Sequence, residues 1–385
     1  MTETPKVAIA TGILGKATET GVRRHIGMLF GGNTVILCER REPNYESEKP
    51  IFTSVGGRKG VTATIEREIG KAVQSLRYRC SGVPFGSVRR EMETFLRENG
   101  VQAIVAEFGH LGGNLAPVGN ALGIPVFVYF RGFDASKRLR SPRIVRRYKA
   151  AMPRLAGVIS VSQSLLDNLA DVGVTHPNSA VIPTGVDTSA FVPLEKDPNL
   201  ILSVGRIVEK KAPLLTIDAF AAIAGDFPEH RLEIIGDGEL RGAAEEHVRA
   251  LGLGDRVTFH GLKEHAFVRE KIGQAQVYLQ HSVTAADGNT EGLPTSIQEA
   301  MACGTVVVST RHAGIPEVII EGETGLLADE HDGEGFTQCL RQVLSDPEAA
   351  ARMSRTARDL ATERLDYRVL HGRLEEIIRA SLRQP

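Results

Sequence analysis

Hydrophobic runs rich in Val and Ile recur along the chain and alternate with longer stretches at helical spacing. The first series is Val7–Ala10, Val35–Leu37, Ala103–Ala106, Pro125–Phe130 and Val158–Val161. The second series is Ile201–Val204, Leu232–Ile235, Val257–Phe259, Val277–Leu279 and Val306–Ser309. Continuous apolar runs between helices are typical of parallel strands buried on both faces. The pattern predicts two doubly wound α/β domains with a cleft between them, where ligands bind beyond the carboxyl ends of the strands.

A segment with the composition of a linker separates the two series. Thr188–Asn199 contains Pro193, Pro198 and several charges. We therefore expect an N-terminal domain over 1–187, a linker over 188–198 and a C-terminal domain over 199–366. Residues 367–385 form a final segment, in which Tyr367 to Leu382 has a helical apolar stripe, and we expect this helix to pack back on the N-terminal domain. The stripe consists of Leu370, Leu374, Ile377 and Ile378.

Composition narrows the class of protein. A length of 385 residues fits two domains, and 42% hydrophobic with 24% charged residues excludes disordered and fibrous folds. The four Cys have no metal-ligand or disulfide-framework spacing, which favours a reducing cytoplasm. No apolar run approaches the roughly 18 residues of a membrane-spanning helix. The first run is too short for a secretory signal and lacks a cleavage signature.

Charge is divided unevenly along the chain although the net charge is only −1. Residues 1–160 hold 25 Lys and Arg against 13 Asp and Glu, whereas the remainder carries a net charge of −13. An acid-free basic run lies in the first part: Lys137, Arg138, Arg140, Arg143, Arg146, Arg147, Lys149 and Arg154. The run is either a solvated helix face or a surface for anionic lipid headgroups or a lipid diphosphate. Tyr148 is its one aromatic residue, so a nucleic-acid partner is not expected.

Two Glu residues eight positions apart flank the start of a predicted helix. Thr295–Ala302 has the pattern of a helix, with Glu291 just before it and Glu299 in its second turn. Free N–H groups and the dipole at a helix N-terminus favour phosphate, while carboxylates accept hydrogen bonds from sugar hydroxyls. The alternative is that Glu291 is a helix cap and Glu299 a solvated surface residue.

A basic loop follows the first strand of the second series. Arg206 and Lys211 lie five apart, before a helix that Pro213 can start. A planar guanidinium and a point-charged ammonium together suit a diphosphate. The alternative is a solvated basic turn.

Other turns carry weaker signals. Gly236-Asp-Gly238 follows a strand, and Gly12, Gly15 and Gly21 follow the first strand, but none has the full dinucleotide-binding spacing. Each of these is either a close approach to a ligand or a tight strand–helix turn. Arg131 and Asp134 follow the predicted strand Pro125–Phe130. They either face the expected cleft or form an ion pair that closes the loop. No metal-ligand spacing and no serine-nucleophile elbow is present, so we expect neither chemistry.

The order of these motifs resembles the retaining glycosyltransferases of family 4. The C-terminal motifs are Gly205-Arg206 with Lys211, Gly236-Asp-Gly238, Phe259-His-Gly261, Glu291 with Glu299, Gly314-Ile-Pro-Glu317 and Gly322-Glu-Thr-Gly325. His281-Ser-Val-Thr and Thr310-Arg-His resemble members that build bacterial exopolysaccharides. The N-terminal half matches more loosely, at Thr20–His25, Ala106–Gly109, Phe130–Asp134 and Gly185–Asp187. The resemblance implies the GT-B fold, with two Rossmann-like domains facing a central cleft, and a nucleotide-sugar donor.

The resemblance also implies a role for each matching residue. Arg206 and Lys211 hold the donor diphosphate, Glu299 binds the ribose and Glu291 contacts the transferred hexose. The implied catalytic residues are Arg206, Lys211, Glu291, Arg131 and Asp134. The implied donor-binding residues are Gly21, Gly205, Gly236, Asp237, Gly238, His260, Gly261, Leu262, Gly292, Leu293, Thr295, Ser296 and Glu299. Within that set, His260 to Leu262 line the base pocket, backbone N–H groups of Gly292 to Ser296 serve sugar and phosphate, and Gly21 approaches the phosphates.

One position departs from the family pattern. Many members have a sugar-contacting His where this chain has Arg131, and a permanently charged guanidinium cannot act as a general base. Either Arg131 orients an anionic or heavily hydroxylated sugar, or it plays a different part.

The expected partners are a nucleotide-sugar donor, a glycan or lipid-linked oligosaccharide acceptor and an anionic membrane surface. We expect no cofactor and no metal, and a cytoplasmic location that is peripheral on the inner membrane face. Two alternatives remain: a nucleotide-sugar epimerase of similar fold, and an inactive nucleotide-sugar-binding subunit.

Overall fold

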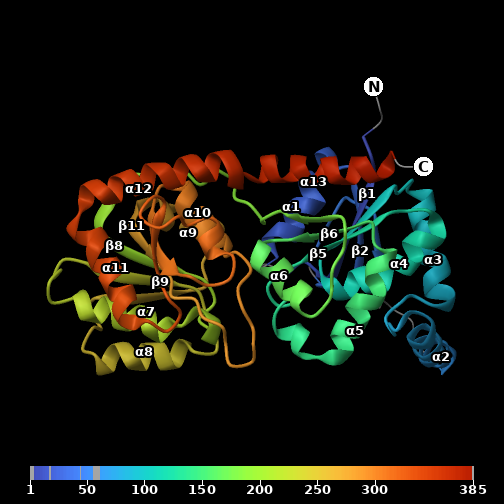
Figure 1. Ribbon diagram of the computed structural model, residues 1–385, viewed down its shortest axis with the longest axis horizontal. Coiled ribbons are helices and arrows are strands. Elements are labelled where there is room, and N and C mark those ends of the chain that lie inside the picture. The colour runs from blue at the N-terminus through green and yellow to red at the C-terminus, as the bar shows by residue number, and fades with distance from the viewer. Residues whose placement is uncertain (1–3, 17–18, 44, 55–60, 384–385) are drawn as a thin grey trace. The chain divides into compact units, whose positions relative to one another are not determined.

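The computed structural model describes residues 4–16, 19–43, 45–54 and 61–383. The chain divides into two compact units, one of residues 1–182 with 371–385 and one of residues 183–370. Each unit contains a parallel sheet with helices on its faces (Figure 1). The prediction of two doubly wound α/β domains is confirmed.

The first unit has a seven-stranded sheet in the order β3-β2-β1-β4-β5-β6-β7, with every pair parallel. The strands are β1 (Val7–Leu14), β2 (Thr34–Arg41), β3 (Ile51–Thr53), β4 (Ala103–Ala106), β5 (Val126–Phe130), β6 (Gly157–Ser160) and β7 (Ser179–Val181). The helices are α1 (Thr20–Met28), α2 (Val61–Tyr78), α3 (Gly86–Glu98), α4 (Gly109–Leu122), α5 (Pro142–Ala151), α6 (Gln163–Asp171) and the part of α13 (Tyr367–Leu382) from His371 onward. Short 3-10 turns are η1 (Leu29–Gly32), η2 (Lys137–Arg140) and η3 (Met152–Arg154).

The second unit has a six-stranded parallel sheet in the order β10-β9-β8-β11-β12-β13. The strands are β8 (Asp197–Val204), β9 (Arg231–Ile235), β10 (Val257–Gly261), β11 (Ala275–Leu279), β12 (Val306–Thr310) and β13 (Gly325–Ala328). The helices are α7 (Pro213–Ile223), α8 (Arg241–Ala250), α9 (His265–Gln274), α10 (Thr295–Ala302), α11 (Gly333–Ser345) and α12 (Pro347–Leu360). Short turns are η4 (Glu209–Lys211), η5 (Ile315–Glu317) and the π-helical turn Ala361–Leu365.

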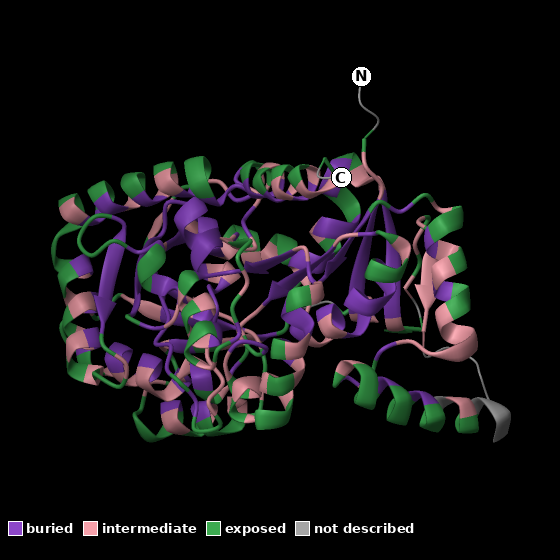
Figure 2. Cartoon of the chain, turned by 45° about the vertical axis from the view of Figure 1, so that its right-hand side comes forward, coloured by how far each residue is buried: buried purple, intermediate pink, exposed green. Residues whose placement is uncertain are grey.

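Most strand residues of the second unit are buried, as their continuous apolar runs predict, and an exception is the edge strand β10, where Thr258 is exposed (Figure 2). Leu200 and Leu202 of β8 belong to one hydrophobic cluster, whereas Ile201 between them belongs to another. Because successive side chains of a strand point to opposite faces, the two clusters are the two sides of this sheet.

Every predicted strand lies within an observed one, apart from a residue at an end, but three strands were not predicted. β3 and β7 have three residues each, none of them fully buried, so neither forms a continuous apolar run, and the four-residue β13 begins with Gly325. The structure also extends β1 to Leu14, paired with Arg41 of β2, so Gly12 lies inside the strand and not in the turn after it.

The segment predicted as a linker belongs to the second unit. The chain passes from the first unit to the second between Ile182 and Pro183. Phe191 is buried in the core, and the Thr188 hydroxyl donates to the Asp366 carboxylate. The prolines and charges of 188–198 therefore mark an ordered loop that leads into β8. The helix predicted from Tyr367 to Leu382 is α13, and Leu374 and Ile378 are buried in the first unit.

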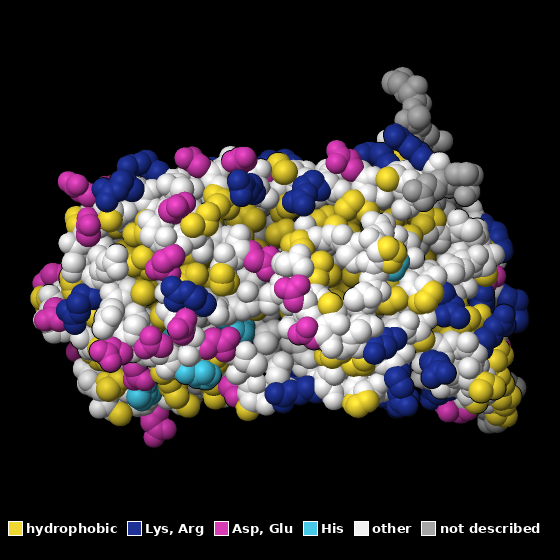
Figure 3. Space-filling model, in the orientation of Figure 1, with side chains coloured by type: hydrophobic (Ala, Val, Ile, Leu, Met, Phe, Trp, Pro, Cys, Tyr) yellow, Lys and Arg dark blue, Asp and Glu magenta, His cyan; other side chains and the backbone are white. Residues whose placement is uncertain are grey.

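The charge division of the sequence is visible on the surface. Lys and Arg side chains gather around the part of the first unit where α5 and α2 lie, and Asp and Glu are frequent over the second unit (Figure 3). Among the residues described, no helix combines the length and the apolar character that crossing a membrane requires.

Candidate active site

The loop after β8 brings three cationic residues to the carboxyl end of that strand. Gly205 has a φ of +150°, and a Cβ there would lie 3.1 Å from Cε of Lys211. The side chain of Arg206 is exposed, whereas Lys210 and Lys211 turn inward. Within the described chain, the Arg206 guanidinium takes part in no side-chain hydrogen bond or ion pair. It is therefore available to an anion from outside.

Glu291 lies between the two inward lysines. Its Oε2 is 3.4 Å from Nζ of Lys210, and its Oε1 is 3.5 Å from Nζ of Lys211. Burial raises the pKa of Glu291, but Lys211 and Lys210 outweigh burial and lower it to about 2. Oε1 is fully buried and has no hydrogen-bond partner among the described residues. The cluster thus holds an ionised carboxylate whose Oε1 is ion-paired with Lys211 but accepts no hydrogen bond from the described residues.

The two lysines are fixed by further polar contacts. Nζ of Lys211 donates to Oε1 of Gln280 at 2.9 Å, and Nζ of Lys210 donates to the Thr290 carbonyl at 3.1 Å. Burial lowers the pKa of Lys211, while Glu291 opposes that shift. Of these two lysines, we predicted only Lys211 as a site residue from the sequence, and the structure shows that Lys210 also contacts Glu291.

A buried histidine holds the backbone of Glu291. The Glu291 N–H donates to Nε2 of His312 at 3.0 Å, and Nδ1 of His312 is 2.6 Å from the Glu330 carboxylate. Since a backbone N–H can only donate, Nε2 is the acceptor and Nδ1 carries the proton toward Glu330. Glu330 also accepts from the Thr284 N–H at 2.7 Å. The sequence-based assignment missed His312 and Glu330, although Thr310-Arg-His was part of the resemblance.

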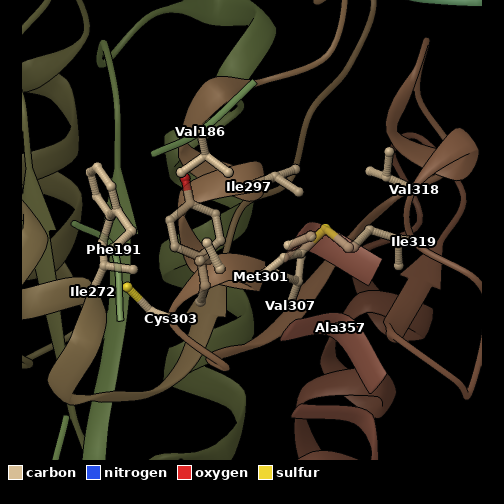
Figure 4. Packing of buried hydrophobic residues seen from close by; sticks show 14 of the residues in the cluster. Val186, Phe191, Ile272, Ile297, Met301, Cys303, Val307, Val318, Ile319 and Ala357 are labelled. Carbon is tan, nitrogen blue, oxygen red and sulfur yellow. The ribbon is translucent and has the colours of Figure 1, made fainter. Parts of the chain in front are cut away.

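Helix α10 is anchored beneath this cluster. Ile297 and Met301 on its inner face point into the core toward Val307 of β12 (Figure 4). Its N-terminal residue Thr295 follows Pro294, and no side chain caps the first turn. The backbone N–H groups of that turn are therefore available to an acceptor, as at other anion-binding helix starts.

Both alternatives proposed for the Glu pair are wrong. Glu291 does not cap α10, because its carboxylate is bound by lysines. Glu299 is buried in the second turn of α10 and is not a solvated surface residue. Near them, the hydroxyl of Tyr278 lies 2.7 Å from Oγ of Ser296 and 2.9 Å from Oε1 of Gln280. Gly292 accepts from the Gly314 N–H at 2.8 Å, and Leu293 is part of the core.

The glycine turns of the second unit pack on each other. A Cβ on Gly236 would lie 1.9 Å from the Gly205 carbonyl oxygen, and one on Gly238 would lie 2.3 Å from that of Ile207. Glycine is needed here because two strand-end turns meet backbone to backbone. Asp237, between the glycines, is 3.5 Å from the Arg241 guanidinium.

The predicted base pocket is at the end of β10. Nε2 of His260 is 2.8 Å from Glu233, which also binds Lys271 at 2.8 Å. Gly261 has a φ of +68° and accepts from the Gly236 N–H. The Leu262 side chain next to it is largely exposed. These contacts orient His260 and leave Leu262 open to a ligand.

A second polar cluster lies in the first unit. Nη2 of Arg131, after β5, donates to Oε2 of the fully buried Glu107 at 2.6 Å, and Nδ1 of His25 from α1 bonds the other oxygen. Burial raises the pKa of Glu107, but His25 and Arg131 outweigh burial and lower it to about 2. Cζ of Arg131 is also 4.8 Å from the centre of the Tyr129 ring. Sequence reasoning included Glu107 in a motif but gave it no role.

Asp134 is separate from that pair. Its carboxylate is 3.8 Å from Nη1 of Arg138, so the predicted alternative of an Arg131–Asp134 ion pair is replaced by two different pairs. Burial raises the pKa of Asp134 to about 6. Gly21 is buried in α1.

The basic run is only partly a solvated face. Arg147 donates to Oδ1 of Asn114 at 3.3 Å, and Arg138 lies 3.4 Å from Nδ1 of His110. Burial, with Arg138 and Arg147, lowers the pKa of His110 to about 4. Arg143, Arg146 and Lys149 are exposed on α5. In the residues that the structure describes, no group of three or more His, Cys, Asp or Glu is arranged to hold a metal ion.

Two family models together match most of the chain. Residues 187–360 match "Glycosyl transferases group 1", and residues 34–190 match "Glycosyltransferase Family 4". The putative colanic acid biosynthesis glycosyltransferase WcaL of Escherichia coli is 29% identical over 284 residues, which are 72% of this chain and 70% of that protein. The amylovoran biosynthesis glycosyltransferase AmsK of Erwinia amylovora is 29% identical over 257 residues, 65% of this chain and 62% of that one.

Solved structures share the fold over nearly the whole chain. HepE of Anabaena, in complex with UDP and glucose, has a TM-score of 0.77 at 16% identity, covering 98% of this chain and 100% of that one. Sucrose-phosphate synthase of Thermosynechococcus elongatus has a TM-score of 0.72 at 18% identity, covering 98% of each chain. The matching family models, these relatives and the two sheets agree with the sequence motifs. The chain belongs to the group 1 glycosyltransferases of family 4 and has the GT-B fold.

Proposed function

We propose that this chain is a retaining glycosyltransferase that moves a hexose-type sugar from a nucleotide-diphosphate sugar to a hydroxyl of a glycan or lipid-linked acceptor. The relatives WcaL and AmsK are named for the synthesis of colanic acid and amylovoran, which supports a place in exopolysaccharide synthesis. HepE has been solved with UDP and with UDP-glucose, which supports a nucleotide-sugar donor.

The buried carboxylate of Glu291 carries the proposal. It is held ionised by Lys210 and Lys211, and its Oε1 has no hydrogen-bond partner among the described residues. A buried polar atom without a partner is costly, so its retention favours a ligand that supplies a donor. A sugar hydroxyl is such a donor. We assign Glu291 to the hexose of the donor.

The surrounding groups suit the rest of the donor. The exposed guanidinium of Arg206 and the ammonium of Lys211 bind the diphosphate, together with the uncapped N-terminus of α10. Glu299 accepts from the ribose hydroxyls, and the base lies against His260 to Leu262. In the first unit, Arg131, whose charge Glu107 balances, binds a hydroxyl-rich or anionic part of a substrate.

The mechanism follows from where charge develops. As the bond from the sugar C1 to the diphosphate oxygen breaks, the ring gains oxocarbenium character and the leaving phosphate gains negative charge. Arg206, Lys211 and the helix start oppose that charge, which lowers the barrier. The acceptor hydroxyl attacks from the side that the diphosphate leaves, and a phosphate oxygen of the departing diphosphate takes its proton. This front-face path retains the configuration and needs neither a protein nucleophile nor a metal.

The test combines binding with product analysis. A thermal-shift screen of UDP-, GDP-, ADP- and TDP-sugars identifies the base, because a ligand at 100 times its Kd adds about 2.7 kcal/mol of stability. NMR of the product with an acceptor then reports the anomeric configuration. Retention supports the proposal and inversion contradicts it. Inversion at the sugar C2 without transfer would identify an epimerase, and binding without turnover would identify an inactive subunit.

The expected location is peripheral, at the cytoplasmic face of the inner membrane. Its support is the basic surface of the first unit together with the lipid-linked class of acceptor. Arg143, Arg146 and Lys149 supply the exposed charge on α5.

A further inference from the structure

Helix α2 of the first unit presents a row of aliphatic side chains to solvent. Ile65, Ile69, Val73 and Leu76 are 53%, 51%, 42% and 89% exposed. Among the described residues eleven large hydrophobic side chains are exposed, and these four lie on one helix. Figure 2 shows the helix with most of its residues exposed, and Figure 3 shows hydrophobic side chains gathered where α2 lies in Figure 1.

The four side chains form a single stripe. Their spacing is four, four and three residues, so at about 100° per residue they fall within an arc of about 80°. A surface helix normally turns its apolar stripe toward the core and its polar face toward water. In α2 the large aliphatic residues are on the outer side.

The inner side of α2 is occupied by small and polar residues. Gly70 packs so closely on Phe85 that a Cβ would lie 2.8 Å from the Phe85 Cβ. Gln74 is buried and donates to the Pro84 carbonyl at 3.1 Å. The Ser87 N–H donates to the Glu66 carboxylate at 2.8 Å, which ties the same helix to the start of α3. The helix is therefore docked by its polar side, and its stripe stays exposed to solvent.

Cationic side chains surround the end of the stripe. Arg77 and Arg79 are exposed at the end of α2. The guanidinium carbons of Arg77 and Arg154 lie 5.2 Å and 5.4 Å from the centre of the Tyr78 ring, which brings the end of the basic run to the end of α2. Helix α5 packs against α2 and has no acidic residue. On α2 itself, Glu68 is paired with Lys71 at 2.6 Å.

We propose that α2 is a membrane-docking helix, whose stripe enters the interface of an anionic bilayer while the cations of α2 and α5 contact the lipid headgroups. The proposal rests on the proposed function only for the lipid-linked acceptor. The choice of an anionic membrane as the partner follows from the exposed stripe and the cations beside it. An aliphatic row flanked by exposed positive charge matches an anionic lipid surface, which is apolar beneath and negative above. A second copy of this chain would bring the same positive charges together, which disfavours self-association.

Binding should require both features, because one short apolar element or one basic patch gives only marginal attachment. Vesicles of 30% phosphatidylglycerol in phosphatidylcholine should therefore bind the full chain at low salt, and pure phosphatidylcholine should not. About 0.5 M salt should release the protein, since it shortens the screening length well below the roughly 8 Å of physiological ionic strength.

The test replaces stripe residues and measures vesicle flotation. Ile69→Gln with Leu76→Gln should lower the partition coefficient on the anionic vesicles by about tenfold or more. Leu251→Gln and Ile320→Gln are the matched controls, because both residues are exposed aliphatics, at 41% and 42%, in the second unit. The control protein should float like the wild type. Thermal melting and UDP-sugar hydrolysis are measured in the same samples without vesicles, and all should match the wild type.

The outcomes separate this proposal from the enzymatic one. If the stripe variant floats as well as the wild type, α2 is not the docking helix, whatever the activity. If light scattering shows a dimeric wild type that the variant converts to a monomer, with vesicle binding unchanged, a second copy occupies the stripe and the proposal is overturned. Loss of flotation with intact hydrolysis supports it. Failure of the wild type to use any nucleotide sugar refutes the proposed function and leaves the flotation result standing.

Discussion

Replacement of Glu107 by Gln tests the charge balance of the first unit. The carboxylate is fully buried and bonds both Arg131 and His25. Gln keeps the shape and one acceptor oxygen but removes the negative charge. Arg131, which is largely buried, then loses its nearest counter-charge, and removal of one partner of a buried pair typically costs about 3–5 kcal/mol. We expect the free energy of unfolding to fall by about 3 kcal/mol, near the lower end of this range, because Gln still accepts a hydrogen bond.

The pH dependence of stability provides an independent check. The folded-state pKa of Glu107 is about 2, below its ordinary value of 4.5, so its contribution is fully present above about pH 4.5 and is lost as the pH falls toward 2. The corresponding free energy is about 3 kcal/mol, of which about 1 kcal/mol is lost by pH 4 and about 2 kcal/mol by pH 3. The wild type and Glu107→Gln should therefore converge in stability as the pH is lowered.

The assay is urea unfolding followed by circular dichroism at pH 7 and pH 4. Hydrogen exchange of peptides from β4 and β5 assigns the change to the first unit. Glu68→Gln is the control, because Glu68 pairs with Lys71 at 2.6 Å with both side chains about half exposed, and its replacement should cost about 1 kcal/mol or less. Activity should fall about 10- to 100-fold if Glu107 positions Arg131 for the substrate. A variant that unfolds at the wild-type urea concentration at pH 7 would refute the reasoning.

The other predictions concern the second unit and the basic face. Arg206→Ala should lower kcat/KM by roughly 10²–10³ and leave the melting temperature unchanged, since its side chain is exposed; wild-type kinetics would show that Arg206 does not bind the diphosphate. Lys211→Ala should lower kcat/KM similarly but also cost about 1–3 kcal/mol of stability, because it deprives the buried Glu291 of a partner, and calorimetry distinguishes the two variants. Glu299→Ala should mainly weaken nucleotide binding in titration calorimetry, whereas Glu291→Ala should mainly lower kcat; normal binding and turnover in both would make the pair structural. Charge neutralisation of Arg143, Arg146 and Lys149 should weaken binding to anionic vesicles without changing donor hydrolysis. If the wild type binds anionic and neutral vesicles equally, the basic run is only a solvated helix face.

The elements around the second-unit cluster could be predicted because their signals are local. Helix α10 begins and ends where the sequence predicts, after Pro294 and before Gly304. Pro213 begins α7 for the same kind of reason, since a proline suits the first helical position. Such signals depend on residues a few positions apart and are readable from one sequence.

The partners of buried charges could not be predicted, because they come from distant parts of the chain. Glu107 meets His25 from 82 residues away, and no local pattern marks either residue as buried. Adjacent lysines pose the same problem: Lys210 and Lys211 both turn inward to Glu291, whereas the sequence-based assignment selected one. The stripe of α2 has a helical period, but the period alone predicts that it faces the core. Only the packing of Gly70 and Gln74 shows that it does not.

The charge division of the chain has opposite consequences for its two anionic partners. Residues 161–385 carry a net charge of −13, so the long-range field of that part repels a diphosphate. Its attraction must come from Arg206, Lys211 and the start of α10, which act over a few ångströms, and burial excludes water from Lys211. A membrane surface is instead sensed at the range of the screening length, where the net charge of +12 in residues 1–160 is the relevant quantity. Donor binding should therefore depend weakly on salt and vesicle binding strongly, and titration of both in one series from 0.05 to about 0.5 M salt separates short-range recognition from long-range attraction.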